Sequence, residues 1–185
     1  MSLDYAILGF LNYKPLTGYD LKKMFDTSVQ HFWPADQSQI YRTLARLTAD
    51  GMARVEVVPQ EDRPDRKVYH ITHAGRDALN AWLQGPFPSS PSRSAPLIQV
   101  FFSGQLNDAD IRARFAEAKA IFETILQQYE QVPALIDEYI REVDSPRETY
   151  FWLLTLDLGI RTMRVQIEWA DEVVRLIDEG GLPPA

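Results

Sequence analysis

The sequence predicts a mainly α-helical protein with two parts: an N-terminal domain of three helices, a β-hairpin and a fourth helix, and a C-terminal pair of long antiparallel helices. Three observations support this fold class. Signals that start and stop helices recur over residues 2–84, two β-prone runs flank a charged turn within that stretch, and apolar residues repeat at steps of three and four along most of residues 107–178. The chain has 185 residues and a 45% hydrophobic content, which allows one or two small domains and excludes wholesale disorder.

Two short helices are expected at the N-terminal end. The first covers residues 3–12, where apolar residues recur on one face; Ser2 can cap it, and Pro15 lies in the segment that ends it. Thr17 and Asp20 have the spacing of a capping box, so they predict the start of a second helix. The inner face of this second helix consists of Leu21, Met24 and Phe25.

The best-bounded helix lies between Asp36 and Gly51. Asp36 is an acidic N-cap with Gln39 three residues on, and Gly51 can adopt the left-handed conformation that ends a helix. The inner side holds Ile40, Leu44 and Leu47, and the opposite side holds Ser38, Gln39, Arg42, Ala45, Arg46 and Ala49. This outer side is small, polar and cationic. Such a face suits the major groove of DNA, where arginine reads guanine and alanine lets the backbone approach.

A plain solvated helix face would show the same pattern, and the following elements favour the DNA-reading interpretation. Residues 54–58 and 67–71 are β-prone and flank a charged, turn-prone segment, so they predict a hairpin, and Thr72 can cap a fourth helix. This is the element order of a winged helix-turn-helix domain, with the third helix as reader and the hairpin as wing. The candidate DNA-contacting residues are Ser38, Gln39, Tyr41, Arg42, Arg46, Arg63, Arg66 and Lys67.

Several of these segments together resemble the PadR family of bacterial transcriptional regulators. The matching motifs are Leu16-Thr17-Gly18-Tyr19-Asp20-Leu21, Phe32-Trp33-Pro34, Ser38-Gln39-Ile40-Tyr41-Arg42-Thr43-Leu44, and Tyr69-His70-Ile71-Thr72 with Gly75. The resemblance is close over residues 3–83, and the remaining chain is similar in length and pattern to the family's helical C-terminal extension. It implies a homodimeric winged-helix repressor, often released by a small aromatic or drug-like molecule.

The net charge of −7 is distributed unevenly along the chain. Residues 1–84 contain ten Lys and Arg and ten Asp and Glu, whereas the other residues contain nine and sixteen. Because counterion release depends on local phosphate contacts, a neutral domain with a basic face can still bind DNA. The acidic total therefore does not exclude a double-stranded DNA operator, for which a dimer would favour an inverted repeat.

The sequence lacks the residues that several other classes of function require. The chain has no cysteine, which excludes disulfides, thiolate zinc sites and cysteine nucleophiles. It has no Gly-rich phosphate loop, serine nucleophile elbow or His-Glu-x-x-His motif, and His70 and His73 lack a further ligand at metal-binding spacing, so we expect neither an enzyme nor a metal or cofactor. No apolar run is long enough to span a membrane and no secretory signal is present, which predicts a cytoplasmic protein.

A segment rich in proline and serine, residues 85–96, is expected to link a domain of residues 1–84 to one of residues 97–185. An apolar patch at residues 97–102 should pack between the two domains. Asn107 and Ser145 cap two long helices with heptad-like seams, and Pro133 should bend or break the first of them. Their bulky apolar surface exceeds what one helical hairpin covers and predicts a homodimer. The candidate dimerisation residues are Leu153, Leu156, Ile160, Met163, Ile167 and Val174.

An effector site is a further hypothesis. Tyr19, His31 and Trp33 gather aromatic and polar groups near the second and third helices, and Trp152 could contribute from the C-terminal part. The same residues could instead form the core that fixes the reader. For the whole protein, two alternatives to a ligand-responsive repressor are a winged-helix protein-interaction module and a helical small-molecule-binding protein without DNA function.

Overall fold

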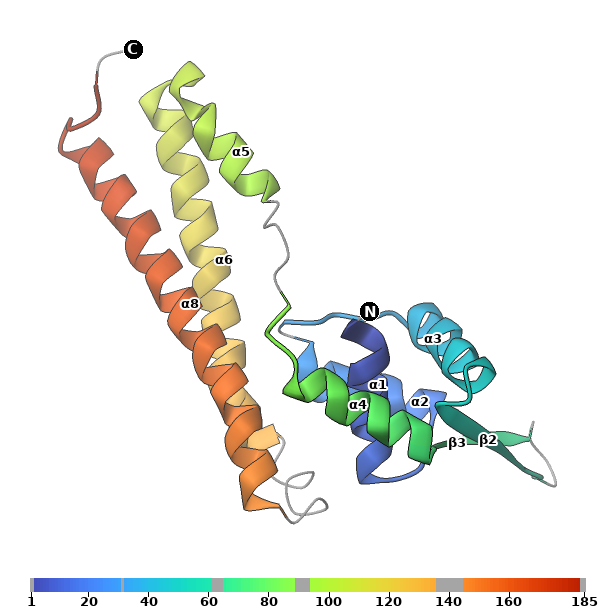
Figure 1. Ribbon diagram of the computed structural model, residues 1–185. Helices are drawn as coiled ribbons and strands as arrows, with labels where there is room; N and C mark the ends of the chain where they lie inside the picture. Colours follow the sequence, from blue (N-terminus) through green and yellow to red (C-terminus); the bar gives the residue numbers. More distant parts are fainter. Residues whose placement is uncertain (1, 31, 61–64, 89–93, 136–144, 184–185) are drawn as a thin grey trace. The chain divides into compact units, whose positions relative to one another are not determined.

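The computed structural model describes residues 2–30, 32–60, 65–88, 94–135 and 145–183. The chain divides into two compact units, Met1–Pro88 and Ser89–Ala185, and this division falls within the segment expected as a linker. Figure 1 labels the elements of both units. Unit 1 contains α1 (Ser2–Tyr13), β1 (Leu16–Thr17), α2 (Gly18–Met24), the π-helical turn Phe25–Val29, α3 (Gln37–Ala49), β2 (Ala53–Val58), β3 (Arg66–Ile71) and α4 (His73–Gln84).

Local signals in the sequence place the helix ends of unit 1 correctly. Thr17 with Asp20, and Asp36 with Gln39, each form both hydrogen bonds of a capping box, and Gly51 has the positive φ of 70° that ends α3. Helix α1 begins at Ser2 itself, one residue earlier than predicted. The predicted inner face of α3 is confirmed, because Ile40, Leu44 and Leu47 are all at most 1% exposed.

The wing belongs to a three-stranded antiparallel sheet with the order β1-β3-β2. The predicted hairpin is confirmed, and its register pairs Ala53 with Ile71 at the base and Val58 with Arg66 toward the tip. Strand β1 was not predicted. It has only two residues, Leu16 and Thr17, too few for an alternating pattern to be recognised in the sequence.

Gly75, in the first turn of α4, lies against the base of the wing. A Cβ atom at this position would lie 2.2 Å from the carbonyl oxygen of Met52 and 2.9 Å from Cγ1 of Ile71. Gly75→Ala must therefore shift backbone, and we expect it to lower the free energy of unfolding of unit 1 by about 1–3 kcal/mol, measured by urea denaturation. Gly9→Ala in α1 is the control, because nothing lies within 4 Å of its added Cβ. Equal stability of the two variants would contradict this prediction.

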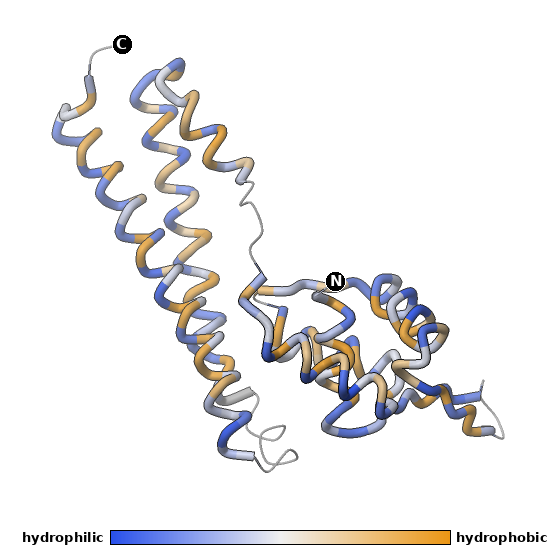
Figure 2. The backbone as a smooth tube through the Cα atoms, viewed as in Figure 1, coloured by the Kyte–Doolittle hydropathy of each residue, from blue (hydrophilic) through white to orange (hydrophobic). Residues whose placement is uncertain are grey.

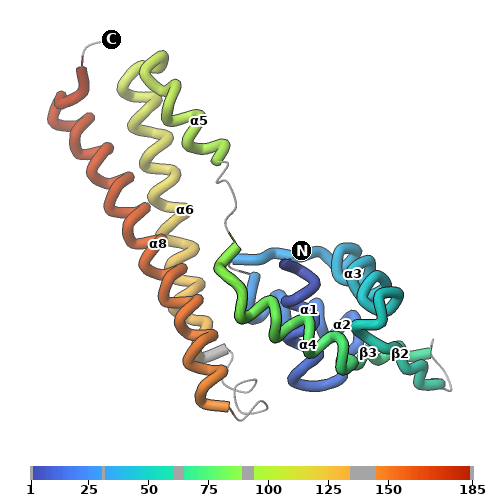
Figure 3. Tube along the Cα trace, viewed as in Figure 1, coloured from blue at the N-terminus to red at the C-terminus, as the bar shows by residue number. Residues whose placement is uncertain are grey.

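Unit 2 is a helical hairpin with a short helix before it. Its elements are α5 (Ala95–Phe101), a 3-10 turn (Ser103–Gln105), α6 (Asp108–Leu135) and α8 (Pro146–Asp178), and α6 and α8 run antiparallel beside each other (Figure 3). Hydrophobic and hydrophilic positions alternate along both long helices (Figure 2). The ring of Phe115 meets that of Trp169 edge to face at 5.2 Å, and Arg112 donates to Asp178 at 2.6 and 3.0 Å, so both apolar and charged contacts join the helices.

Three expectations for unit 2 need correction or lie outside the described residues. Helix α6 continues through Pro133 to Leu135, so the proline does not end the helix at its own position, and the later seam positions 136, 139 and 143 are not described. Helix α5 starts at Ala95, inside the segment expected as linker, because Ser94 caps it and Pro96 lies in its first turn. The large side chains of the apolar patch are exposed in the single chain. These are Leu97, Ile98, Phe101 and Phe102.

No helix in the described ranges is both long enough and apolar enough to cross a membrane.

Candidate nucleic-acid interface

The outer face of α3 is exposed as the sequence predicts. Ser38, Gln39, Tyr41, Arg42 and Arg46 all lie on it, with the small Ala45 and Ala49 between the longer side chains. Burial of the opposite face and the capping box at Asp36 fix the orientation of this helix. The polar face therefore has a rigid support, which precise contacts to base edges require.

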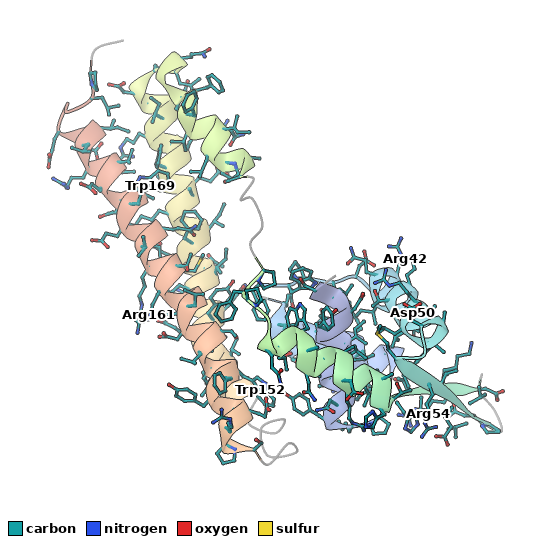
Figure 4. All side chains as sticks on the ribbon, viewed as in Figure 1. Arg42, Asp50, Arg54, Trp152, Arg161 and Trp169 are labelled. Atoms are coloured by element: carbon teal, nitrogen blue, oxygen red, sulfur yellow. The ribbon has the colours of Figure 1, made fainter. Side chains whose placement is uncertain are left out.

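Arg42 and Arg46 differ in their surroundings. The Arg42 side chain extends outward from α3 (Figure 4). Its Nε donates to the carbonyl of Ser38 at 3.3 Å, and Arg42 has no carboxylate partner among the residues described. Arg46 donates from Nη2 to Oδ1 of Asp4 on α1. Arg42 therefore has no ion pair in the described part of the chain, whereas Arg46 is paired with a carboxylate of α1.

Gln39 also has an internal role, because its Oε1 accepts the backbone N–H of Asp36 at 3.0 Å. Its amide N–H groups remain for recognition of another molecule. The residue predicted as a base reader is therefore also the residue that closes the capping box of the reader helix.

The cations of the wing lie near its tip. Arg66 and Lys67 are exposed at the start of β3, and Arg63 lies outside the described residues. Arg66 Nη2 contacts Asp20 Oδ2 at 3.3 Å. Burial favours the neutral form of Asp20, but hydrogen bonds from Thr17 and the guanidinium of Arg66 outweigh it and hold the pKa of this carboxyl below its usual value.

A groove of about 420 Å³ separates the start of α2 from the wing. Tyr19 and Asp20 line one side, Lys67 lines another, and Tyr41 reaches it from α3. Tyr41 can lie there because residue 18 is glycine, since a Cβ on Gly18 would be 2.5 Å from the Tyr41 ring. The groove thus brings reader helix, wing and α2 together at one concave surface.

The predicted effector residues do not meet in this groove. Tyr19 lines it and is 69% exposed, whereas Trp33, 38% exposed, is not among its lining residues. Trp152 lies in unit 2, and His31 is outside the described residues. Their exposure argues against a purely core role for Tyr19 and Trp33.

The predicted dimerisation residues on α8 divide into two groups. Leu156 is only 4% exposed within the single chain, so its side chain packs inside the hairpin. Leu153 is 37% exposed, and Ile160, Met163, Ile167 and Val174 are half-buried. Further apolar side chains of α8 are exposed next to this seam, including Leu154, Leu158 and Val165.

Sequence reasoning missed the residues that hold the cations of unit 1. Asp4 contacts Arg46 across 42 positions of sequence, and Asp20 contacts Arg66 across 46. Spacing along one helix cannot reveal such pairs. Among the described residues no group of three or more His, Asp or Glu is placed to hold a metal ion.

Comparison with known proteins gives consistent matches over both units. Residues 7–81 match the transcriptional regulator PadR-like family, and residues 92–178 match the virulence activator alpha C-terminal family. The probable transcriptional regulator Rv1176c of Mycobacterium tuberculosis is 32% identical, over 97% of this chain and 99% of its own length. The negative transcriptional regulator PadR of Bacillus subtilis is 27% identical, over 96% of this chain and 98% of its own.

Solved structures of Bacillus subtilis PadR have the same fold. The crystal structure with operator DNA matches with a TM-score of 0.83 at 24% identity, covering 96% of this chain and 99% of that chain. The crystal structure with p-coumaric acid matches with a TM-score of 0.75 at 23% identity, with the same coverage.

Proposed function

The chain belongs to the PadR-like family of transcriptional regulators, and from this premise we propose that it is a cytoplasmic, homodimeric repressor that leaves its operator when a small aromatic effector binds. It is a DNA-binding transcriptional regulator and not an enzyme. The observation that carries the proposal is the outer face of α3, where Arg42 is exposed beside the small residues Ala45 and Ala49 and has no carboxylate partner among the described residues. In the major groove the guanidinium can donate to O6 and N7 of guanine, and the alanines allow the backbone to come close.

The wing supplies the second part of the proposed interface. Lys67 forms no ion pair in the described part of the chain and is exposed at the start of β3, so it is available to a phosphate. Phosphate contacts fix the position of the protein on the duplex but carry little sequence information. We therefore assign sequence reading to Ser38, Tyr41 and Arg42 on α3, and backbone contacts to the wing.

A second copy of the chain completes the proposed site. Readers of this kind act in pairs on half-sites about 34–36 Å apart, so one unit 1 reads half of an inverted repeat. The exposed apolar side chains of α8, Leu154, Leu158 and Val165, provide a surface that a partner α8 would cover.

Selection of bound fragments from genomic DNA of the source organism tests the proposal. The purified protein should enrich a small number of sites that share an inverted repeat, and these sites should lie at promoters. Uniform recovery of fragments, independent of sequence, would contradict it. The genes beside the enriched sites would also indicate which effectors to test.

The effector is proposed to bind near Tyr19 and Trp33. PadR of Bacillus subtilis has been solved with p-coumaric acid, and here two exposed aromatic rings offer stacking surfaces for a phenolic ring. The effector must prefer the conformation that does not bind DNA, because equal affinity for both would change nothing.

Trp33→Ala should remove the response to phenolic acids while operator affinity without ligand stays within about twofold of the parent. A coupling of about 1–3 kcal/mol would make the effector weaken operator binding in the parent by roughly 5- to 150-fold. Gel-shift titrations with and without a panel of phenolic acids measure both quantities. If the variant instead loses thermal stability and DNA affinity together, Trp33 has a core role and the pocket assignment is wrong.

A further inference from the structure

The four described cations of the proposed DNA surface fall into two groups. Arg42 and Lys67 have no carboxylate partner within the described ranges, whereas Arg46 is held by Asp4 and Arg66 by Asp20. The partners do not come from the reader helix or the wing. They come from α1 and α2, the helices that support these elements.

Both carboxylates lie in the first turn of a helix, and Asp20 is also held independently of its arginine. Asp4 lies in the first turn of α1, and its side chain is only 18% exposed. Asp20 lies in the first turn of α2, where its Oδ2 accepts the Thr17 hydroxyl at 2.7 Å and the Thr17 N–H at 3.2 Å. The positive end of a helix dipole favours a negative charge in the first turn. Each arginine is therefore tied to a fixed point of the domain.

The arginines themselves are not removed from solvent by this contact. The side chain of Arg46 is 44% exposed and that of Arg66 is 53% exposed. A guanidinium has five N–H donors in one plane, and each carboxylate contact occupies only part of them. Each arginine thus keeps donors for a phosphate, but in a direction that the carboxylate sets.

We propose that Asp4 and Asp20 are positioning residues that aim Arg46 and Arg66 at the phosphates of one DNA register and so increase discrimination against non-operator DNA. This inference rests on the proposed DNA-binding function. On the operator, base contacts from α3 hold the protein in one register, where an aimed guanidinium meets its phosphate. On other DNA the protein samples many registers, and its affinity depends on cations that can follow the phosphates. Restraint of Arg46 and Arg66 therefore lowers the affinity for non-operator DNA.

Asp4→Asn tests the proposal, because it frees Arg46 with minimal change in shape. Affinity for a shuffled duplex should rise about fivefold, the upper range for an exposed ion pair, and the salt slope on that duplex should steepen by about 0.9, the value for one more phosphate. Affinity for the operator should rise by less than about twofold, so the ratio of the two affinities falls. Fluorescence anisotropy titrations over a series of salt concentrations measure all of these.

Two further variants separate positioning from a general charge effect. Asp26→Asn also removes one negative charge from unit 1, but Asp26 pairs with Lys22 on the same helical segment and not with a cation of the proposed surface. Asp26→Asn should leave the ratio of operator affinity to shuffled-duplex affinity unchanged. In an Arg46→Ala background, Asp4→Asn should no longer lower the ratio, because its effect acts through Arg46. Three results would overturn the proposal. Asp4→Asn could raise affinity equally on both duplexes, it could fail to raise affinity for the shuffled duplex, or it could still lower the affinity ratio in the absence of Arg46.

Arg46→Ala alone keeps the test decisive if Asp4→Asn unfolds α1. An aimed arginine contributes mainly in the operator register, so the variant should lose more affinity for the operator than for the shuffled duplex. Equal losses on both would overturn the proposal. A parent protein that shows no preference for the operator would instead contradict the proposed function, before any variant is compared.

Discussion

Replacing Ile160 and Ile167 with Glu should convert the protein to a monomer and lower operator affinity by about 100-fold or more. Both isoleucines are half-buried on α8, beside exposed apolar side chains, so the substitutions place two charges in the proposed dimer seam. A dimer escapes that cost by dissociating. The loss on DNA follows because two linked readers bind about 10²- to 10⁴-fold more tightly than one. Sedimentation and gel-shift titration measure the two effects.

Two controls accompany this experiment. Thr162→Glu puts the same charge on an exposed polar position of α8 between the two isoleucines and should leave the dimer intact. Leu156→Glu should instead reduce helix content, measured by circular dichroism, because this side chain is buried within the single chain. A parent protein that sediments as a monomer at micromolar concentration would contradict the dimer proposal.

Arg42→Ala should weaken operator binding by about 1–3 kcal/mol and relax specificity at one base pair of each half-site, because it removes a guanidinium proposed to read a base edge. Lys67→Ala provides the contrast. It should weaken operator and shuffled duplex by similar factors and lower the salt slope by about one phosphate. Gel-shift titrations of both variants on both duplexes separate the two roles. If both variants bind like the parent, α3 is not the reader.

The parts of the fold that the sequence predicts correctly are those that depend on neighbouring residues. The capping boxes at Thr17 and Asp36, the left-handed Gly51 and the serine cap at Ser145 each act within a few positions, and all are present in the structure. The exposed face of α3 follows from helical spacing in the same way. Because these signals also fix the order of elements, they were sufficient to predict a winged helix with a helical hairpin.

The features that the sequence did not reveal depend on contacts between distant segments. Strand β1 exists because Leu16 and Thr17 pair with β3, and two residues have no pattern of their own. The pairing of Arg46 with Asp4 requires the packing of α1 on α3. The π-helical turn after α2 is a different case, because its side-chain contacts are local: the hydroxyls of Thr27 and Ser28 donate to carbonyls of the preceding turn.

Unit 2 shows the same limit for apolar residues. Hydrophobicity alone suggested that residues 97–102 are packed, but Phe101 is 81% exposed in this chain. The seam pattern likewise did not separate Leu156, which packs inside the hairpin, from Leu153, which is exposed. Periodicity identifies the apolar side of a helix, but it does not identify which neighbour covers each residue.

We propose that the chain recognises a DNA sequence as a dimer, through α3 and the wing. The most direct test is a binding titration of the parent protein on its selected operator and on a shuffled duplex of equal length, at one stated salt concentration. We expect affinity for the operator to be at least about 10³-fold higher, with two protomers bound per inverted repeat. Equal affinity for the two duplexes would contradict the claim.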